Sequence, residues 1–140
     1  MKSLTPKEIA ENETKLVGLL DKYYQKSPDP WFNSQTMFAS LLTRVSEGNA
    51  ILLVWDDFNG FISCDFKVNP VKKRKEAVIW TVYNPNPKYK ADVLSMIEHE
   101  AKLRGVEAVV FFAPNPIAFN KLVKNFGYNC SLGYFEKEMM

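Results

Sequence analysis

The 140-residue sequence contains few of the side chains from which metal and redox sites are built: two cysteines and one histidine. Cys64 and Cys130 lie far apart, with neither a Cys-x-x-Cys spacing nor a histidine pair beside them, so the sequence predicts no metal site. Two thiols and no segment resembling a targeting signal favour a reducing, cytoplasmic setting. No apolar run approaches the ~18 residues that a membrane-spanning helix needs, so we expect no membrane segment.

Glycine is also scarce, with six residues in the chain and none between Gly60 and Gly105. A glycine-rich phosphate-binding loop is therefore absent from that stretch. The formal net charge of +2 is too small to indicate nucleic-acid binding by itself. The content of 46% hydrophobic and 14% aromatic residues predicts a packed globule, and the length predicts a single domain over residues 1–140.

Helix signals dominate the first third of the chain. The run "TPKE" has Thr5 as an N-cap, a proline for the first turn and Glu8 to complete a capping box. Apolar residues then recur at helical spacing, which predicts one amphipathic helix to about Gln25. A second helix is expected from about Ser34 to just before Gly48.

Strand signals follow. "AILLVW" and "FISCDFKV", joined by "DDFNG", predict an antiparallel hairpin around an Asn-Gly turn. "NPVKKRKE" leads into "AVIWTV" as a further hairpin. A helix is predicted from about Lys90 to Arg104 and closed by Gly105, with Val93, Leu94, Ile97 and Ala101 on one face.

The C-terminal part continues with a buried strand "EAVVFFA", a helix from Asn115 to Gly127 and a last strand "LGYFEKEM". The predicted order is α-α-β-β-β-α-β-α-β. The strand–helix–strand unit from Ala77 to Ala113 should pair its strands in parallel, beside antiparallel strands. The expected fold class is α/β, with a mixed, mainly antiparallel sheet flanked by helices.

This order, together with the stretch "EAVVFFAPNPIAFNKLVKNFGY", resembles the GNAT superfamily of acyl-CoA-dependent N-acetyltransferases. Asn115, Ala118, Leu122, Gly127 and Tyr128 stand where the family has its strand, asparagine, helix and closing glycine–aromatic signature. "MIEHEAKLRGV" resembles the end of the preceding helix of that family. No conspicuous first strand precedes Thr5, where family members usually have one.

The resemblance implies acetyl-CoA as the cofactor, with its pyrophosphate at the N-terminus of the helix that begins near Lys90. "PNPKYK" there replaces every glycine of the family's loop, and its two prolines remove N–H donors. In one interpretation lysine side chains and the remaining amides hold the phosphates; in the other, the loop simply leads into a helix. The cofactor-binding candidates are Val82, Tyr83, Lys88, Tyr89, Lys90, Ala91 and Asn115.

Candidates for catalysis are few. The family often has a tyrosine in the last helix that donates to the leaving thiolate, and Val123 stands at that position. Tyr128 is the nearby alternative. For the base that removes the amine proton, the candidates are Glu76, at the start of "AVIWTV", and Asp65 on the neighbouring strand. For Asp65 we favour a solvent-facing position in an alternating strand.

The remaining polar features have structural interpretations. His99 is expected on the solvent side of its helix, and Cys64 in the core. The cluster Lys72-Lys73-Arg74-Lys75 is placed at a hairpin tip, where a solvated turn is favoured over a contact with nucleic acid, an acidic protein or a cofactor phosphate.

These observations favour a GNAT-fold protein whose acetyltransferase activity is weak or lost and which acts as a binding or assembly module. Its partner would be another protein or a second copy, and accessory proteins of phages or mobile elements are one expected setting. The alternative is an acetyl-CoA-dependent N-acetyltransferase with a divergent phosphate loop. Nucleic acid is disfavoured as a partner, since only the lysine-rich hairpin suggests it.

Overall fold

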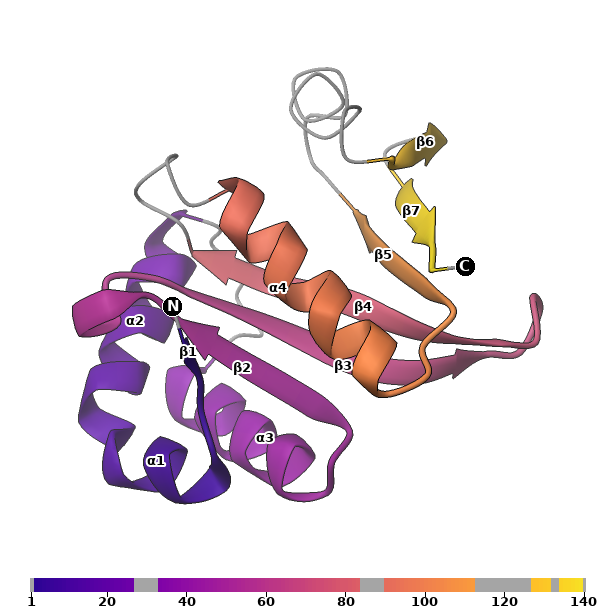
Figure 1. The fold of residues 1–140 in the computed structure, drawn as a ribbon. Coiled ribbons are helices and arrows are strands. Elements are labelled where there is room, and N and C mark those ends of the chain that lie inside the picture. Colours follow the sequence, from indigo (N-terminus) through magenta and orange to yellow (C-terminus); the bar gives the residue numbers. More distant parts are fainter. Residues whose placement is uncertain (1, 27–32, 84–89, 113–126, 132–133, 140) are drawn as a thin grey trace. The chain divides into compact units, whose positions relative to one another are not determined.

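The computed structural model describes residues 2–26, 33–83, 90–112, 127–131 and 134–139 (Figure 1). The chain divides into two compact units. The N-terminal unit comprises Met1–Asp65 and Trp80–Tyr89, and the C-terminal unit comprises Phe66–Ile79 and Lys90–Met140. Two long strands, β3 (Phe61–Asn69) and β4 (Arg74–Tyr83), contribute residues to both units.

The helices of the N-terminal unit are α1 (Pro6–Glu11), α2 (Glu13–Lys26) and α3 (Ser34–Ser46). The capping box of Thr5 and Glu8 is present as predicted. The prediction of one continuous helix to Gln25 is wrong, because the chain turns at Asn12. The Asn12 side chain donates to the Glu8 carbonyl at 2.8 Å, which ends α1 there.

The strands of this unit form an antiparallel arrangement. The strand β2 (Ala50–Val54) pairs with β3 in a register from Ala50↔Asp65 to Val54↔Phe61, so the predicted hairpin is confirmed. Its turn is not the expected Asn-Gly turn but a short 3₁₀ segment, Asp56–Phe58, with left-handed backbone at Asp57 and Phe58. On the other side, the two-residue strand β1 (Lys2–Ser3) pairs with β2; this first strand was not predicted.

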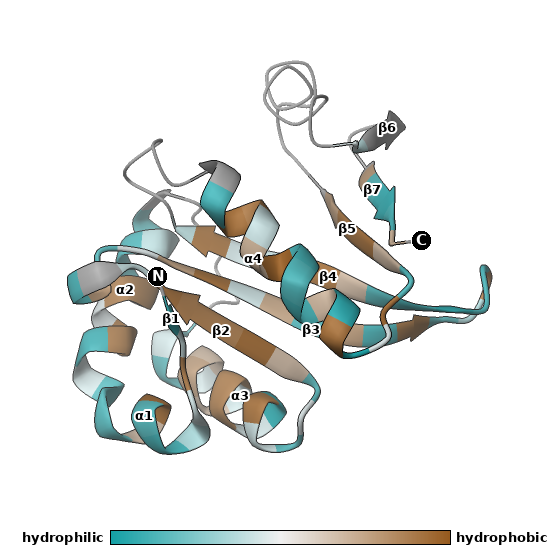
Figure 2. Ribbon diagram, in the orientation of Figure 1, coloured by the Kyte–Doolittle hydropathy of each residue, from teal (hydrophilic) through white to brown (hydrophobic). Residues whose placement is uncertain are grey.

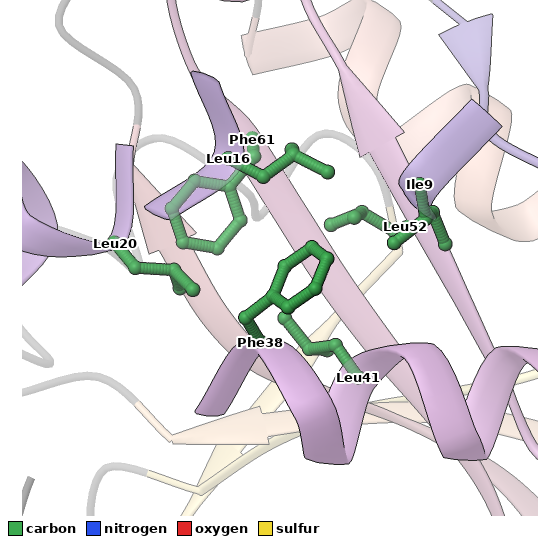
Figure 3. Close-up of a pocket in the computed structure, with 7 residues that line it drawn as sticks. All are labelled: Ile9, Leu16, Leu20, Phe38, Leu41, Leu52 and Phe61. Atoms are coloured by element: carbon green, nitrogen blue, oxygen red, sulfur yellow. The ribbon is translucent and has the colours of Figure 1, made fainter. Parts of the chain in front are cut away.

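The helices and the sheet of the N-terminal unit share one apolar core. The side chains of Ile9, Leu16, Leu20, Phe38, Leu41, Leu52 and Phe61 converge around a hollow of about 10 Å³ (Figure 3). That volume is at the lower limit for a single water molecule. The hollow is therefore a packing detail of the core, and too small to hold a cofactor.

The C-terminal unit is built on a parallel strand pair. The first part of β4 pairs with β5 (Ala108–Phe112) from Glu76↔Ala108 to Val78↔Val110, which confirms the predicted parallel crossover. The strand β7 (Tyr134–Glu138) runs antiparallel to β5, and β6 (Asn129–Ser131) pairs with β7. The predicted last strand corresponds to β7, and β6 was not predicted.

The crossover helix α4 (Lys90–Leu103) has the predicted bounds to within a residue. Its predicted apolar face is buried, with Val93, Leu94, Ile97 and Ala101 each no more than 8% exposed. Gly105 follows with φ +66°, the left-handed conformation that ends the helix. The helix predicted from Asn115 to Gly127 lies outside the described residues except for its last position.

The seven described strands follow the order β1-β2-β3-β4-β5-β7-β6. Only the β4–β5 pair is described as parallel, so the fold is a mixed, mainly antiparallel α/β sheet flanked by helices, as predicted. Apolar residues concentrate in β2 and β5 (Figure 2). No helix in the described part of the chain is long and apolar enough to cross a membrane.

Candidate functional site

The candidate cofactor residues lie around the end of β4 and the start of α4. Val82 and Tyr83 end β4, where Val82 is 43% exposed and Tyr83 is half-buried. Between the two exposed residues Trp80 and Val82, Thr81 is buried and its hydroxyl bonds to that of Ser63 on β3. Exposed side chains therefore alternate with a buried, hydrogen-bonded one at this end of β4.

The phosphate-binding candidates are placed only in part. Lys88, Tyr89 and Asn115 lie outside the described residues, and Lys90 and Ala91 form the beginning of α4. The first turn of α4 also contains Asp92, which is exposed. A carboxylate in this turn already supplies the negative charge that a helix N-terminus favours, and it would repel a phosphate.

Asp65 is not solvent-facing; that prediction is wrong. Its side chain is 2% exposed, and the guanidinium of Arg44 on α3 donates to both of its carboxylate oxygens. The same guanidinium lies 5.2 Å from the ring centroid of Trp80 on β4. Three elements of the N-terminal unit are therefore joined through one arginine.

Sequence reasoning missed both Arg44 and Trp80. A signal for Arg44 was available, because it follows the buried Leu41 by three residues and so lies toward the same side of α3. A cation on the apolar side of a helix indicates a buried anion opposite. Trp80 gave no such signal, since a tryptophan in a strand fits a core position equally well.

Glu76, the other candidate base, lies at the start of β4 in the C-terminal unit and is 5% exposed. One of its oxygens accepts from the amide of Asn69 at 3.1 Å, and the other from Nε of Arg74 at 2.9 Å. Both oxygens thus already accept hydrogen bonds from residues at the ends of β3 and β4.

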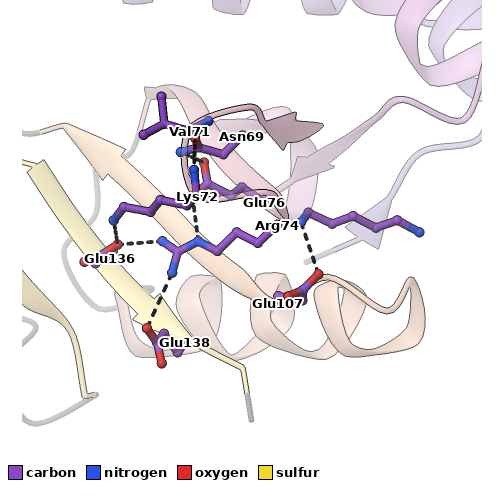
Figure 4. Close-up of polar contacts among 9 residues, drawn as sticks. Asn69, Val71, Lys72, Arg74, Glu76, Glu107, Glu136 and Glu138 are labelled. Atoms are coloured by element: carbon purple, nitrogen blue, oxygen red, sulfur yellow. Dashed lines mark hydrogen bonds and ion pairs between the residues drawn. The ribbon is translucent and has the colours of Figure 1, made fainter.

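Arg74 is the centre of a network of charged side chains (Figure 4). Besides Glu76 it contacts Glu136 at 2.6 Å and Glu138 at 3.5 Å on β7, and Lys72 reaches Glu136 at 2.8 Å. Burial lowers the pKa of Arg74, but its hydrogen bonds to Glu76 and Glu136 outweigh burial and raise that pKa above its ordinary value. The hydrogen bonds from Lys72 and Arg74 lower the pKa of Glu136.

This network corrects the prediction for the basic cluster. Lys72 and Lys73 lie in the turn, but Arg74 and Lys75 are the first residues of β4. Arg74 is 11% exposed and is paired with carboxylates, so it does not belong to a solvated turn. Two of the four cations, Lys72 and Arg74, therefore neutralise acids of the same unit, which leaves less positive charge for a polyanion.

The remaining candidates have structural surroundings. Tyr128 is 4% exposed, with its ring 5.4 Å from that of Phe111 and Nζ of Lys137 5.7 Å from its ring centroid. His99 is exposed and Cys64 is 1% exposed, both as predicted. Within the described ranges, no three histidine, cysteine or acidic side chains are grouped so that they could hold a metal ion.

Comparison with known proteins gives a likeness in structure without a likeness in sequence. No family model matches the chain, and no curated protein matches it. Solved structures do match over nearly the whole chain. A predicted acetyltransferase with acetyl-CoA from Clostridium acetobutylicum is 14% identical, over 94% of this chain and 90% of that one, with a TM-score of 0.69.

Two further structures agree. An acetyltransferase of the GNAT family from Staphylococcus aureus Mu50 is 8% identical over 93% of this chain and 94% of that one, with a TM-score of 0.65. A chain from the NatC complex bound to Gag peptide and CoA is 13% identical over 99% of this chain and 97% of that one, with a TM-score of 0.65. The described architecture is thus the mixed α/β architecture of these structures. The chain has the GNAT fold, and its low identity to these proteins marks it as divergent in sequence.

Proposed function

We propose that this GNAT-fold protein has weak or lost acetyltransferase activity and acts as a binding or assembly module. The observation that supports this most is that both candidate bases already bind side chains of the protein. Asp65 is held by Arg44, and Glu76 by Arg74 and Asn69. A general base must direct a lone pair at the proton it removes, and these oxygens already accept bonds from the protein.

The start of α4 supports the same proposal. Asp92 brings a negative charge into the helical turn that would have to receive the cofactor's pyrophosphate. The preceding "PNPKYK" stretch has none of the glycines of the family's loop, and its two prolines remove N–H donors there. Both features weaken the binding of acetyl-CoA in its usual place without altering the fold.

An assembly role is supported by one of the similar structures, whose chain belongs to the NatC complex. For the present chain, a protein partner is the corresponding proposal. A cytoplasmic setting belongs to it too, supported by the small number of cysteines. A role among phage or mobile-element accessory proteins stays a prediction, since no described residue bears on it.

The second candidate function is acetyl-CoA-dependent N-acetylation. The observation that favours it is that similar chains are described with acetyl-CoA or CoA. Under this proposal Lys88 and Lys90 hold the phosphates as point charges, Val82, Tyr83 and Asn115 contact the rest of the cofactor, and the amides of Tyr89 and Ala91 contribute hydrogen bonds.

Calorimetric titration and thermal unfolding with acetyl-CoA separate the two functions. A ligand at ~100 times its dissociation constant adds about 2.7 kcal/mol of stability, which raises the unfolding midpoint by several degrees. The binding-module proposal predicts no shift at millimolar acetyl-CoA. The enzyme proposal predicts a clear shift that Lys88→Glu/Lys90→Glu abolishes.

A matched control is Lys22→Glu/Lys102→Glu, which makes the same change of charge on two exposed helix lysines. A shift that the control retains and the Lys88/Lys90 variant loses would overturn the binding-module proposal. If both variants lose the shift of the unfolding midpoint, the lysines attract the phosphates unspecifically. Neither variant would then be evidence for a cofactor site.

A further inference from the structure

The outer part of the β3–β4 hairpin has one strand edge that no described strand covers. The register of β2 ends at Ala50↔Asp65, whereas β3 continues for four residues to Asn69. This continuation, Phe66–Asn69, belongs to the C-terminal unit. The opposite side of the same hairpin is occupied, because β4 pairs there with β5.

The direction of the backbone groups at this edge follows from the hairpin's hydrogen bonds. Trp55 donates to the Gly60 carbonyl at 3.0 Å, so every second residue of β3 after Gly60 bonds toward β2. Continuing this alternation, Phe66 and Val68 direct their N–H and C=O groups to the side on which β2 has ended. Such a row of backbone groups is a template for an added strand.

The side chains at this edge are apolar on one face and cationic around it. Val68 is 67% exposed and Val71, in the turn, 87%. Phe66 lies on the same face of β3 as Val68, with the guanidinium of Arg104 4.5 Å from its ring centroid. The exposed cations Lys67, Lys73, Lys75 and Arg104 lie on the hairpin or beside it.

We infer that this edge, Phe66–Asn69, binds an extended segment of another protein in which apolar and acidic residues alternate. The segment adds to β3 as a further strand through the backbone groups of Phe66 and Val68. Its apolar side chains lie beside Val68 on one face, and its acidic side chains face Lys67 on the other. The inference rests on the proposed binding-module function and names the chemistry of its partner.

A second copy of this chain fits the edge less well. Two copies paired antiparallel through Phe66 and Val68 place Lys67 directly opposite Lys67, and like charges in that position are destabilising. Shifting the register by two residues brings Pro70 into the pairing opposite Phe66, and proline has no N–H to donate. Charge complementarity therefore favours an acidic partner.

The probe is a synthetic peptide, Gly-Glu-Val-Glu-Val-Glu-Val-Glu-Gly, and its counterpart with lysine in place of glutamate. Binding is measured by NMR titration of the full-length chain, followed by amide hydrogen exchange. We expect the acidic peptide to bind at least tenfold more tightly than the basic one, and to protect the amides of Phe66 and Val68 from exchange.

Two variants test the edge, and one controls for them. Val68→Asp places a like charge beside the acidic strand, and Lys67→Glu reverses the complementary charge; each should weaken peptide binding at least tenfold. Leu103→Asp is the matched control, because Leu103 is an equally exposed apolar residue of the same unit, at 69%, and lies at the end of α4. It should bind the peptide as the unmodified chain does.

If millimolar peptide does not perturb Phe66 and Val68, the inference is overturned. Peptide binding that Val68→Asp leaves intact overturns it as well. Self-association lost in Val68→Asp would assign the edge to a second copy, and binding of a single-stranded oligonucleotide in place of the peptide would assign it to nucleic acid. Either result overturns the inference too. The acetyl-CoA titration tests the binding-module function independently of the peptide experiment. The peptide can therefore fail to bind while the binding-module function stands, and the binding-module function can be overturned while the peptide binds.

Discussion

At the scale of single residues, the contact between Arg44 and Asp65 should be costly to lose. Arg44→Ala leaves the Asp65 carboxylate, 2% exposed, without the guanidinium that neutralises it. We expect a loss of about 3 kcal/mol in the free energy of unfolding, because removing one partner of a buried ion pair is costly. Urea unfolding followed by tryptophan fluorescence measures it.

The double variant Arg44→Met/Asp65→Leu provides the control. Replacing both charges with apolar side chains removes the buried carboxylate together with its guanidinium, so the double variant should be more stable than Arg44→Ala. A loss below about 1 kcal/mol in Arg44→Ala would contradict the assignment of this pair as a buried structural contact.

Glu136 makes the stability of the C-terminal unit depend on pH. Its pKa is lowered by the hydrogen bonds from Lys72 and Arg74, so the folded chain holds it ionised more strongly than the unfolded chain does. Its contribution is fully present above the unfolded value near 4.5 and is lost as the pH falls through the lower folded value. Glu136→Gln should therefore be less stable than the unmodified chain at pH 7, and the difference should shrink below pH 4.5.

Urea unfolding at a series of pH values between neutral and acidic conditions tests this. Glu138→Gln is the matched control, because Glu138 is on the same strand and 63% exposed and its contact with Arg74 is longer, at 3.5 Å. Its effect should be small at every pH. An effect of Glu136→Gln that does not change with pH would mean that packing, and not charge, accounts for it.

At the scale of elements, the start of α1 is the clearest local signal that the structure confirms. Thr5 accepts from the Glu8 amide at 3.2 Å, and Glu8 accepts from the Thr5 amide at 3.2 Å. Thr5→Ala removes the side-chain acceptor and should lower the unfolding free energy by about 1 kcal/mol, whereas Thr5→Ser keeps the cap and should have little effect. Thermal unfolding of both variants measures this, and equal losses in the two would argue against the cap.

Prediction from the sequence succeeded where the deciding interactions are local. The bounds of α3 and α4 follow from caps and apolar spacing, and the parallel β4–β5 pair follows from the strand–helix–strand order. It failed where the local pattern was ambiguous. Asn12 interrupts a continuous apolar periodicity, and the two residues of β1 are too few to show alternation.

The candidate site was less predictable than the fold, because its contacts join residues far apart in the chain. Arg44 and Asp65 are 21 positions apart, and Arg74 and Glu136 are 62 apart. Strand alternation alone placed Asp65 on the solvent side, since it carries no information about an arginine on a neighbouring helix. The sequence singled out Asp65 and Glu76 as candidate bases, but it did not show that each carboxylate is held by an arginine.

At the scale of the whole molecule, continuous strands should make the two compact units unfold together. Each of β3 and β4 contributes residues to both units, so neither unit keeps its strands if the other unfolds. A chain of 140 residues is also within the size at which a single cooperative transition is usual. Damage confined to one unit should therefore appear in the unfolding of the other.

Ile97→Ala tests this coupling. Ile97 lies on α4 in the C-terminal unit and is 1% exposed, so its truncation should destabilise the chain by about 3 kcal/mol and lower the unfolding midpoint on the order of 10 °C. All three tryptophans, Trp31, Trp55 and Trp80, belong to the N-terminal unit, so their fluorescence reports on that unit alone. The fluorescence midpoint and the far-ultraviolet circular dichroism midpoint should fall together. The contradicting outcome is that Ile97→Ala leaves the fluorescence midpoint unchanged while the circular dichroism shows an earlier transition. The two units would then unfold independently, and the single-domain prediction for residues 1–140 would be wrong.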